Sequence, residues 1–448
     1  MKKTSHSFHS GSIPTLIIRL AIPNTLGLLV VSAYSLADSF FVAALGSDAT
    51  AAVGVTFSLH VLMQAVGYTI GMGAGSLLAR EMGRSNRKKA SFMASLAFFV
   101  ALSIGALITI GGLLFRTPIL RFLGARGSVL EAALSYSVPL FLSAPAMCTS
   151  FVLSQLLRAE GRAIYAMVGL MTGSLLNIAL DPILITLWGL GIAGASVATL
   201  ISQTIGATVL LSAYLGKRKT IDLLWIKWHD LSRLPSILTA GLPSLLRQGL
   251  SGIAAILLNR TAAEVGSSSL SAISLVTRLF LLSFAFCLGL GQAMIPVVGY
   301  NTGADNPTRV KKAFSFSLIA STIVMLILSI PLFFFATPIL RLFGAAEESL
   351  SIGSLALRAQ SAVLVLHGVI TCTILFLQVT GRVVMGSVLA GARQGIFFLP
   401  LIFLLPKFYD GVGLALAQPI ADVLTFLLAI PFLILALGGV RKIKATCS

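Results

Sequence analysis

Twelve long apolar runs follow one another along this chain, and each is long enough to cross a lipid bilayer as a helix. A crossing takes about 20 apolar residues, because a hydrocarbon layer of roughly 30 Å is spanned at about 1.5 Å per residue. The runs lie near residues 14–44, 50–79, 91–115, 128–157, 163–187, 190–215, 234–259, 268–298, 313–335, 350–378, 383–405 and 411–437. Only 10% of the 448 residues are charged, too few to cover the surface of a soluble protein. The sequence therefore predicts an all-α integral membrane protein with twelve transmembrane helices.

The distribution of positive charge indicates how these helices are oriented. The net charge is +18, and most Lys and Arg residues lie in short connections between the apolar runs. With a cytoplasmic N-terminus, 22 of them fall on the cytoplasmic side and 7 on the other. This asymmetry follows the positive-inside rule, so we expect both termini in the cytoplasm and the chain in the plasma or inner membrane. The basic residues then face anionic lipid, and we expect no nucleic-acid partner.

The two halves of the sequence resemble each other at a constant shift of 220 residues. Thr117–Arg121 (TPILR) recurs unchanged as Thr337–Arg341. Further identical pairs at this shift are Pro23 with Pro243, Gly46 with Gly266, Ala52 with Ala272, Gly124 with Gly344, Gly161 with Gly381 and Gly191 with Gly411. Each repeat holds an even number of spans, so both halves enter the membrane with the same orientation. We predict two six-helix bundles related by a pseudo-two-fold axis along the membrane normal.

This repeat divides the chain into an N-lobe (1–215), a cytoplasmic linker (216–233) and a C-lobe (234–448). Two similar bundles that face a central cleft, and that rock to expose it alternately on either side, are typical of transporters. The alternative is that the duplication only builds a stable bundle.

Two carboxylates lie within the apolar runs of the first half. Asp38 is in the first run, one helical turn after Tyr34. Ser174, Asn177 and Asp181 in the fifth run share one helix face. A carboxylate at bilayer depth costs about 2.5–3.5 kcal/mol on insertion scales, which makes each a functional candidate. The oxygen ligands suit Na⁺ or a proton, and the alternative is a static polar pair that fixes helix packing.

The second half carries its own polar groups inside the apolar runs. We interpret six of them as candidates for lining the cleft: Gln248, Arg278, Gln292, His367, Arg393 and Asp422. Asp422 has no obvious partner in the sequence, and we expect it to line the cleft or to pair with Arg393 or Arg278. A lone intramembrane histidine such as His367 is more typical of a hydrogen-bonded core group than of a metal ligand, and we expect no metal centre beyond a Na⁺ at Asp38 and Asp181.

Several motifs, in order and on the expected spans, resemble the multidrug and toxic compound extrusion (MATE) family over nearly the whole chain. They are Pro23 with Ala37–Asp38, Ala43–Gly46, Ala51–Gly54, Leu157–Arg162, Asn177–Pro182, Gly289–Gln292 and Gly299–Gly303. The motifs of the second half look like the branch that contains the DNA-damage-inducible and MepA-type exporters.

This resemblance implies a V-shaped exporter of twelve helices, driven by Na⁺ or H⁺ that enters the cell. The family's N-lobe cation site matches Asp38, Asn177, Asp181 and Thr199, and its bending proline matches Pro23. As the helix-bending and pocket set we take Pro23, Tyr34, Ser154 and Ser174. Carboxylates that one branch uses on the seventh and tenth helices are missing here, which favours coupling in the N-lobe.

The expected activity is therefore antiport of cationic and amphipathic drugs against Na⁺ or H⁺, by a monomer without a cofactor and without enzymatic chemistry. One alternative is a flippase for lipid-linked oligosaccharides from the same superfamily, which would want a more cationic cleft. Another is a membrane-embedded aspartyl protease, which would need a GxGD-type motif that this sequence lacks.

Overall fold

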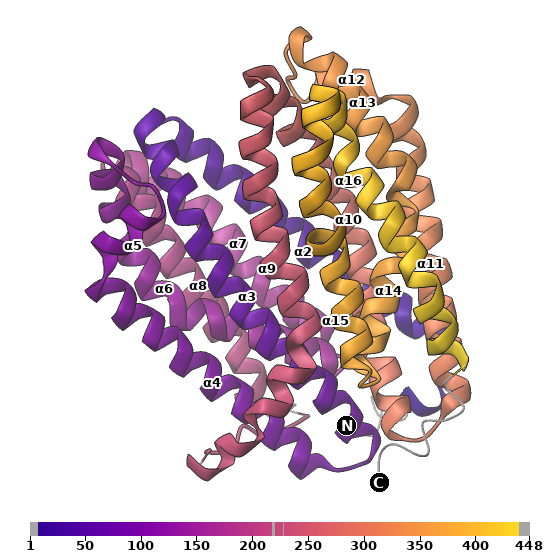
Figure 1. Cartoon of the computed structure of the whole chain (residues 1–448). Coiled ribbons are helices and arrows are strands. Elements are labelled where there is room, and N and C mark those ends of the chain that lie inside the picture. The colour runs from indigo at the N-terminus through magenta and orange to yellow at the C-terminus, as the bar shows by residue number, and fades with distance from the viewer. Residues whose placement is uncertain (1–7, 217–219, 227, 439–448) are drawn as a thin grey trace. The chain divides into compact units, whose positions relative to one another are not determined.

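The structure, a computed structural model, describes residues 8–216, 220–226 and 228–438. Throughout these ranges the ordered elements are helices, and no strand occurs among them (Figure 1). The all-α fold class predicted from the apolar runs is confirmed.

The helices follow the order of the apolar runs. The first half forms α2 (Ile13–Ala43), α3 (Ser47–Gly83), α4 (Arg87–Leu114), α5 (Arg116–Phe122), α6 (Gly127–Ala159), α7 (Ala163–Pro182), the π-helix η1 (Ile183–Leu187) and α8 (Gly191–Leu215). After the 3-10 helix η2 (Trp228–Arg233), the second half forms α9 (Leu234–Val265), α10 (Ser267–Gly303), α11 (Pro307–Phe334), α12 (Ala336–Leu342), α13 (Glu347–Leu364), α14 (Leu366–Val379), α15 (Val383–Gly391), the π-helix η3 (Ala392–Phe398) and α16 (Leu399–Gly438).

Ten of the described helical segments are long and apolar enough to cross a membrane, and α13 with α14, bent by 53°, makes an eleventh. The last of the ten, Val383–Gly438, is 56 residues long, more than twice what one crossing needs. Inside it the backbone of Asp410 is not helical, with φ 45° and ψ −126°. Asp410 lies between the predicted runs 383–405 and 411–437. Counted as two crossings, this segment brings the total to the predicted twelve.

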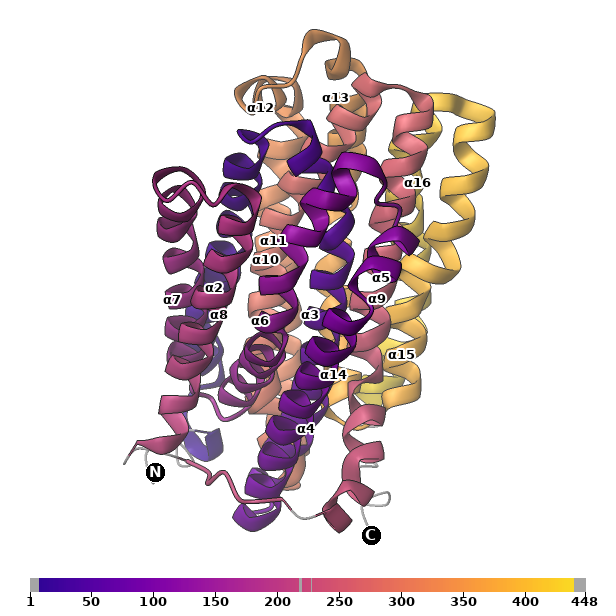
Figure 2. The same ribbon diagram turned by 90° about the vertical axis from the view of Figure 1, so that its left-hand side faces the viewer.

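The described residues form two compact units, which we call the N-unit (Leu26–Gly241) and the C-unit (8–25 with 242–438). Each boundary lies inside the first long helix of a repeat and close to a proline, Pro23 in α2 and Pro243 in α9. In the N-unit, α3, α4 and α8 each pack on α6 (Figure 2). The lobe boundaries expected at 215 and 234 stay a prediction.

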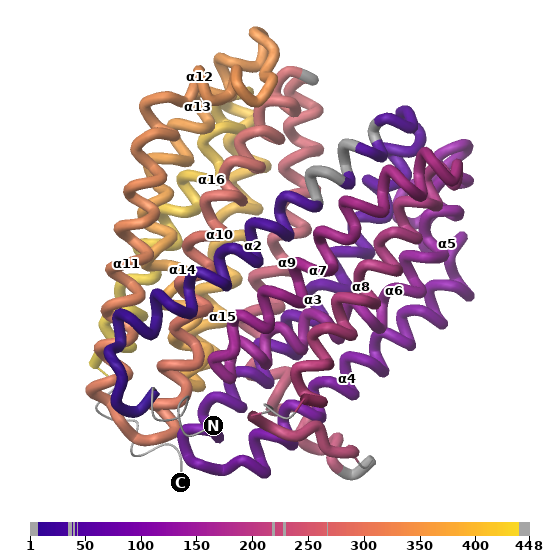
Figure 3. The backbone as a smooth tube through the Cα atoms, turned by 180° about the vertical axis from the view of Figure 1, so that it is seen from behind, coloured from indigo at the N-terminus to yellow at the C-terminus, as the bar shows by residue number. Residues whose placement is uncertain are grey.

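The early part of α2 runs beside α10, the second long helix of the second repeat, and packs closely on it (Figure 3). The early part of α9 packs closely on α3, the second long helix of the first repeat. In the C-unit, a Cβ added to Gly289 of α10 would collide with the Thr25 side chain of α2. In the N-unit, a Cβ added to Gly241 of α9 would collide with the Thr69 carbonyl group of α3. Thr69 and Gly289 occupy equivalent places in the two repeats. The missing side chain at each crossing lets two helix backbones approach, as small residues do in membrane bundles.

The internal repeat is visible in the backbone. The TPILR segments form the short helices α5 and α12, each 7 residues long. Each is followed by a glycine with positive φ, 103° at Gly124 and 82° at Gly344. Asn86 and Asn306 cap α4 and α11 by accepting a hydrogen bond from the backbone N–H three residues later, at 3.1 and 3.2 Å. Turn and cap chemistry is thus shared by both repeats.

Part of the expected linker 216–233 packs on α4. The backbone N–H groups of Asp222 and Leu224 donate to the hydroxyls of Ser91 and Ser95 at 3.1 and 2.7 Å. Residues 217–219 and 227 of this segment lie outside the described residues. The described linker residues belong to the N-unit.

Candidate functional site

Asn177 and Asp181 of α7 meet Thr199 of α8 inside the N-unit. Asp181 is fully buried, and Asn177 and Thr199 are 1% and 4% exposed. With its nitrogen toward Asp181, the Asn177 amide donates to Asp181 Oδ2 at 3.3 Å and accepts from the Thr199 backbone N–H at 3.3 Å. Turned the other way, the amide donates to Thr199 Oγ1 at 3.4 Å. The spacing of Asn177 and Asp181 puts both on one face of α7, just before Pro182 ends that helix.

Asp38 of α2 completes this cluster. Its carboxyl group lies within electrostatic reach of Asp181, so the two acids repel each other when both are ionised. In each of them Oδ1 is buried without a hydrogen-bond partner among the described residues. Sequence reasoning missed Tyr136 of α6, which is buried within electrostatic reach of both acids. The only sequence signal for it was a hydroxyl inside an apolar run.

The donor set of this cluster suits a small cation. It offers two carboxylates, an amide and a hydroxyl, and neither acid forms an ion pair with a described basic side chain. Buried carboxylate oxygens without a partner are costly unless something positive reaches them. Na⁺ with its hard oxygen ligands, or a proton, would satisfy them. We call Asp38, Asn177, Asp181 and Thr199 the acid cluster.

Of the pocket residues expected beside this cluster, some share a cavity and others do not. Tyr34 and Ser174 line a cavity of about 40 Å³ together with His60 and Gln64 of α3. Ser154 is buried, does not line this cavity and donates to the Phe151 carbonyl of its own helix at 2.8 Å. Pro23 lies in α2 as expected, in the part that belongs to the C-unit.

The C-unit has a polar centre of different composition around Asp422 of α16. Arg393 Nε of η3 donates to Asp422 Oδ1 at 2.7 Å, and Gln418 Nε2 donates to the same oxygen at 3.0 Å. Gln360 Nε2 of α13 donates to Oδ2 at 2.8 Å, and His367 Nε2 of α14 lies 3.0 Å from it. Both oxygens of this fully buried carboxylate are therefore used. We call these five residues the ion-pair cluster.

The sequence left open whether Asp422 pairs with Arg393 or with Arg278. Asp422 pairs with Arg393, whereas Arg278 is exposed and makes no contact with Asp422. The sequence pattern showed no obvious partner for Asp422, whereas in the structure four side chains contact its carboxylate. Gln418 was not predicted from the sequence. It lies one helical turn before Asp422, and this spacing could have indicated the contact between the two side chains.

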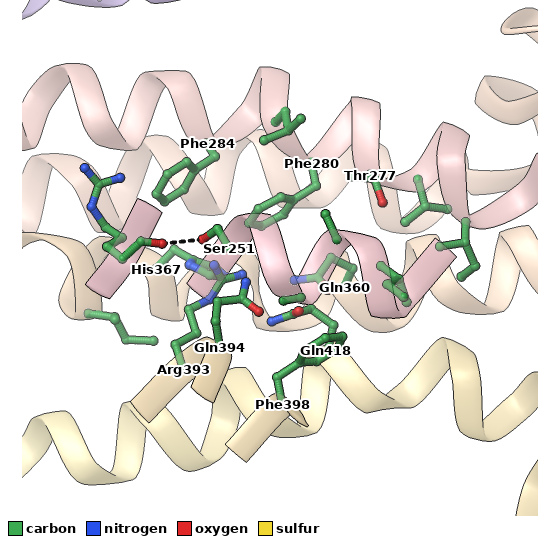
Figure 4. A pocket seen from close by; sticks show the side chains of 18 of the residues that line it. Ser251, Thr277, Phe280, Phe284, Gln360, His367, Arg393, Gln394, Phe398 and Gln418 are labelled. Carbon is green, nitrogen blue, oxygen red and sulfur yellow. Dashed lines mark hydrogen bonds between the residues drawn. The ribbon is translucent and has the colours of Figure 1, made fainter. Parts of the chain in front are cut away.

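A cavity of about 260 Å³ opens beside the ion-pair cluster. Of the residues predicted to line the cleft, Gln248, His367 and Arg393 line this cavity of the C-unit, whereas Arg278 and Gln292 do not; their place in a central cleft stays a prediction. Gln292 is buried elsewhere in the C-unit, and neither polar atom of its side chain has a hydrogen-bond partner among the described residues. Phe280 and Phe284 come from α10, and Arg393, Gln394 and Phe398 face them from η3 (Figure 4). The phenylalanines of α10 thus lie opposite the polar side chains of Arg393 and Gln394, in a cavity whose lining is mainly apolar.

A duplicated bundle of membrane-spanning helices with buried ionisable groups is the architecture of a multi-pass membrane transporter. The MatE family model matches residues 23–183 and again residues 243–404. The chain belongs to this family, whose members are transporters and not enzymes, and the resemblance read from the motifs is confirmed. The two matches begin 220 residues apart, at Pro23 and Pro243.

Individual proteins agree with this assignment. The multidrug export protein MepA of Staphylococcus aureus (strain MSSA476) is 26% identical over 425 residues, which cover 94% of each chain. A crystal structure of MATE in complex with MaL6 superposes with a TM-score of 0.90 at 27% identity, covering 98% of this chain and 99% of that one. A MOP superfamily transporter from Pyrococcus furiosus Vc1 (DSM3638), described as having a binding pocket of reverse polarity, gives 0.88 at 27% identity over 98% of both chains.

Proposed function

We propose that this protein is a secondary active antiporter that exports amphipathic drugs, organic cations among them, in exchange for Na⁺ or H⁺. The drug class is inferred from its relatives, which are named multidrug export proteins. We further propose that it works as a monomer in the plasma or inner membrane with both termini in the cytoplasm. The names of these relatives do not favour the lipid-linked oligosaccharide flippase.

The observation that carries the proposal is the acid cluster. Two carboxyl groups lie within electrostatic reach of each other, each with a buried and unbonded oxygen, and the described residues bring no basic side chain to them. Such an arrangement is unfavourable when empty and becomes favourable when Na⁺ or a proton binds. Binding free energy of this kind can be used to drive a conformational change.

In the proposed cycle, the coupling ion and the drug bind different states of the transporter. The drug binds the inward-open state, and the two repeats rock to expose it outside. An ion entering from outside then binds Asp38 and Asp181, with Asn177 and Thr199 as further ligands, and α2 bends at Pro23. Coupling requires that ion and drug differ in their affinity for the two states.

The test is efflux of a fluorescent organic cation, ethidium, from proteoliposomes under a Na⁺ gradient or a pH gradient imposed separately. The wild-type protein is expected to respond to at least one gradient, which also identifies the ion. Asp38→Asn is expected to abolish the response while the protein still inserts. Asp48→Asn, the same change at an exposed position of α3, is the matched control and is expected to behave like wild type. Full efflux by Asp38→Asn at equal protein content would refute the coupling role.

A further inference from the structure

Arg158, in the last turn of α6, is a buried cation without a counter-charge in the described part of the chain. It is 3% exposed. None of its three guanidinium nitrogens has a hydrogen-bond acceptor, and it forms no ion pair with a described acid. Tyr68 of α3 lies within electrostatic reach without completing a hydrogen bond, and its neutral phenol cannot balance the charge. Because buried charges are normally paired, Arg158 requires a partner of negative charge.

The nearest acid along the chain does not supply this charge. Glu160 lies in the turn after α6, where its carboxylate is 3.6 Å from Arg162 and within reach of Tyr214 of α8. Arg158 is not among the groups that act on that carboxylate. The acid cluster is too distant, because Asp181 lies at the far end of α7, a helix of 20 residues that is about 30 Å long.

A second donor without a partner lies on the same face of α6. Gln155 is 3% exposed, and its Nε2 has no acceptor among the described residues. Residues three apart on a helix are neighbours, and the side chain of Arg158 leans back over the preceding turn, toward Gln155. Helix α3 packs tightly against this face, since a Cβ added to Gly71 would lie 3.0 Å from Gln155 Cβ. Gln155 and Arg158 thus offer four unbonded nitrogens and one positive charge.

The second repeat carries no charge at the equivalent place. At the shift of 220, Arg158 corresponds to Gln378 and Gln155 to Leu375. Gln378 Nε2 donates to Ser244 Oγ at 3.0 Å, so this buried side chain of the C-unit is neutral and hydrogen-bonded. The backbone plan that both repeats share therefore does not require a guanidinium group here.

We propose that Gln155 and Arg158 bind a small inorganic monovalent anion of the size of chloride. The anion accepts hydrogen bonds from the unbonded nitrogens and supplies the counter-charge that the described chain lacks, and charge-assisted bonds of this kind are strong in a buried site. The burial of both side chains favours a monatomic ion over a lipid headgroup or an organic acid. This site is separate from the acid cluster, and the inference does not rest on the proposed export function.

The test is binding of radiolabelled chloride to the full chain in phosphatidylcholine nanodiscs, measured by equilibrium dialysis with gluconate to keep the ionic strength constant. The wild-type protein is expected to bind chloride saturably after subtraction of empty nanodiscs. Arg158→Gln, which copies the residue of the C-unit, is expected to weaken binding about tenfold or more, the loss of one charge-assisted contact. Replacing gluconate by chloride should also raise the Tm of the wild-type protein and leave that of Arg158→Gln unchanged.

Two further variants make the result specific. Gln155→Leu, which also copies the C-unit residue, removes one donor and keeps the charge. It is expected to weaken chloride binding about threefold, and it tests the site even if Arg158→Gln fails to fold. Arg121→Gln, the same loss of charge at an exposed position of α5, is the matched control and should bind chloride like wild type.

Several results would overturn the proposal. They are the absence of saturable chloride binding by the wild-type protein, unchanged binding in folded Arg158→Gln or in Gln155→Leu, and an equal loss in Arg121→Gln, which would indicate an effect of net charge alone.

Two additional arms define the occupant and its independence from transport. Unlabelled bromide is expected to displace the labelled chloride, whereas phosphatidylglycerol in the nanodiscs is not, and displacement by this lipid would replace the inorganic anion by a lipid phosphate and refute the proposal as stated. Asp38→Asn is expected to bind chloride like wild type. If Asp38→Asn exports ethidium normally while Arg158→Gln loses chloride, the export proposal fails in its coupling step and the anion site stands.

Discussion

The N-unit and the C-unit share a backbone plan and differ in the charge at their polar centres. The same short helix, glycine turn and asparagine cap recur 220 residues apart. The acid cluster of the N-unit nevertheless holds two carboxylates without a described basic partner, whereas the ion-pair cluster holds a single carboxylate saturated by an arginine and three other side chains. Duplication has preserved the scaffold while each half acquired its own chemistry.

A comparison of equivalent positions makes the difference specific. At the shift of 220, Asp38 corresponds to Leu258 and Asp181 to Leu401, so the C-unit lacks both acids. In the other direction Arg393 corresponds to Gly173, and Asp422 corresponds to Ser202. Neither cluster could be assembled in the other repeat by a single substitution. Under the proposed function, cation exchange belongs to the N-unit, whereas the C-unit holds a fixed ion pair.

The largest expected effect comes from breaking the ion pair of the C-unit. Arg393→Met removes the guanidinium from Asp422, a fully buried carboxylate. An uncompensated buried charge costs about 3–5 kcal/mol of stability, because desolvation is no longer offset. Thermal unfolding in detergent would detect this as a large loss of stability. The double variant Arg393→Met/Asp422→Leu is expected to recover much of it.

A surface pair in the same unit provides the control for this experiment. Arg260 Nε lies 3.3 Å from Glu264 Oε1, with side chains 77% and 66% exposed. Arg260→Met is expected to change stability by no more than about 1 kcal/mol, since water screens such pairs. Similar losses in the two arginine variants would contradict the view that burial makes the Arg393–Asp422 pair important.

A second difference between the repeats lies at the end of α6, outside the membrane-spanning segments. Glu160 is 1% exposed in the N-unit, and its counterpart in the C-unit is Thr380. Burial raises the pKa of Glu160 from its ordinary value of 4.5 to about 7, although Tyr214 and Arg162 favour the charged form. Between about pH 4.5 and pH 7, the folded protein therefore keeps a proton on Glu160 that the unfolded chain releases.

The sign of the pH dependence follows from this raised pKa. Protonated Glu160 favours the folded state over the unfolded chain, relative to the situation at high pH. This contribution to stability is fully present below about pH 4.5 and is lost as the pH rises through about 7, with a total on the order of 3 kcal/mol. Glu160→Thr, which copies the C-unit residue, is expected to flatten the fall in thermal stability between pH 5 and pH 8. The exposed Glu131 of α6 gives the control variant Glu131→Thr, which should retain the wild-type slope. An unchanged slope in Glu160→Thr would exclude this residue as the source.

The fold could be predicted almost entirely from the sequence, since apolar runs of sufficient length and a constant repeat shift leave few other architectures. The polar centres could be predicted only in part. Asn177 and Asp181 share a helix face, so their meeting follows from local spacing. The contacts of Asp422 with Gln360, His367 and Arg393 join helices 29 to 62 residues apart, and no periodicity encodes such contacts. Arg278 illustrates the limit, because its position in an apolar run did not reveal that it is exposed and lies outside the ion-pair cluster.

The smallest expected effect on stability concerns the acid cluster and sharpens the contrast with Arg393. Asp181→Asn keeps the shape of the side chain and removes a charge that the N-unit does not compensate with a described base. We expect a stabilisation of less than about 1 kcal/mol, because repulsion from Asp38 disappears and an amide is cheaper to bury.

The matched change in the C-unit is Asp422→Asn, which removes the charge that holds Arg393. It should cost clearly more stability than Asp181→Asn in the same thermal unfolding assay, since it leaves a guanidinium without its counter-charge. If Asp181→Asn is the more destabilising of the two, the acid cluster is a structural hydrogen-bonded pair. A site for an exchangeable cation should instead tolerate neutralisation of its acid and lose only its response to the ion gradient, and this combination is what separates the two halves of the molecule.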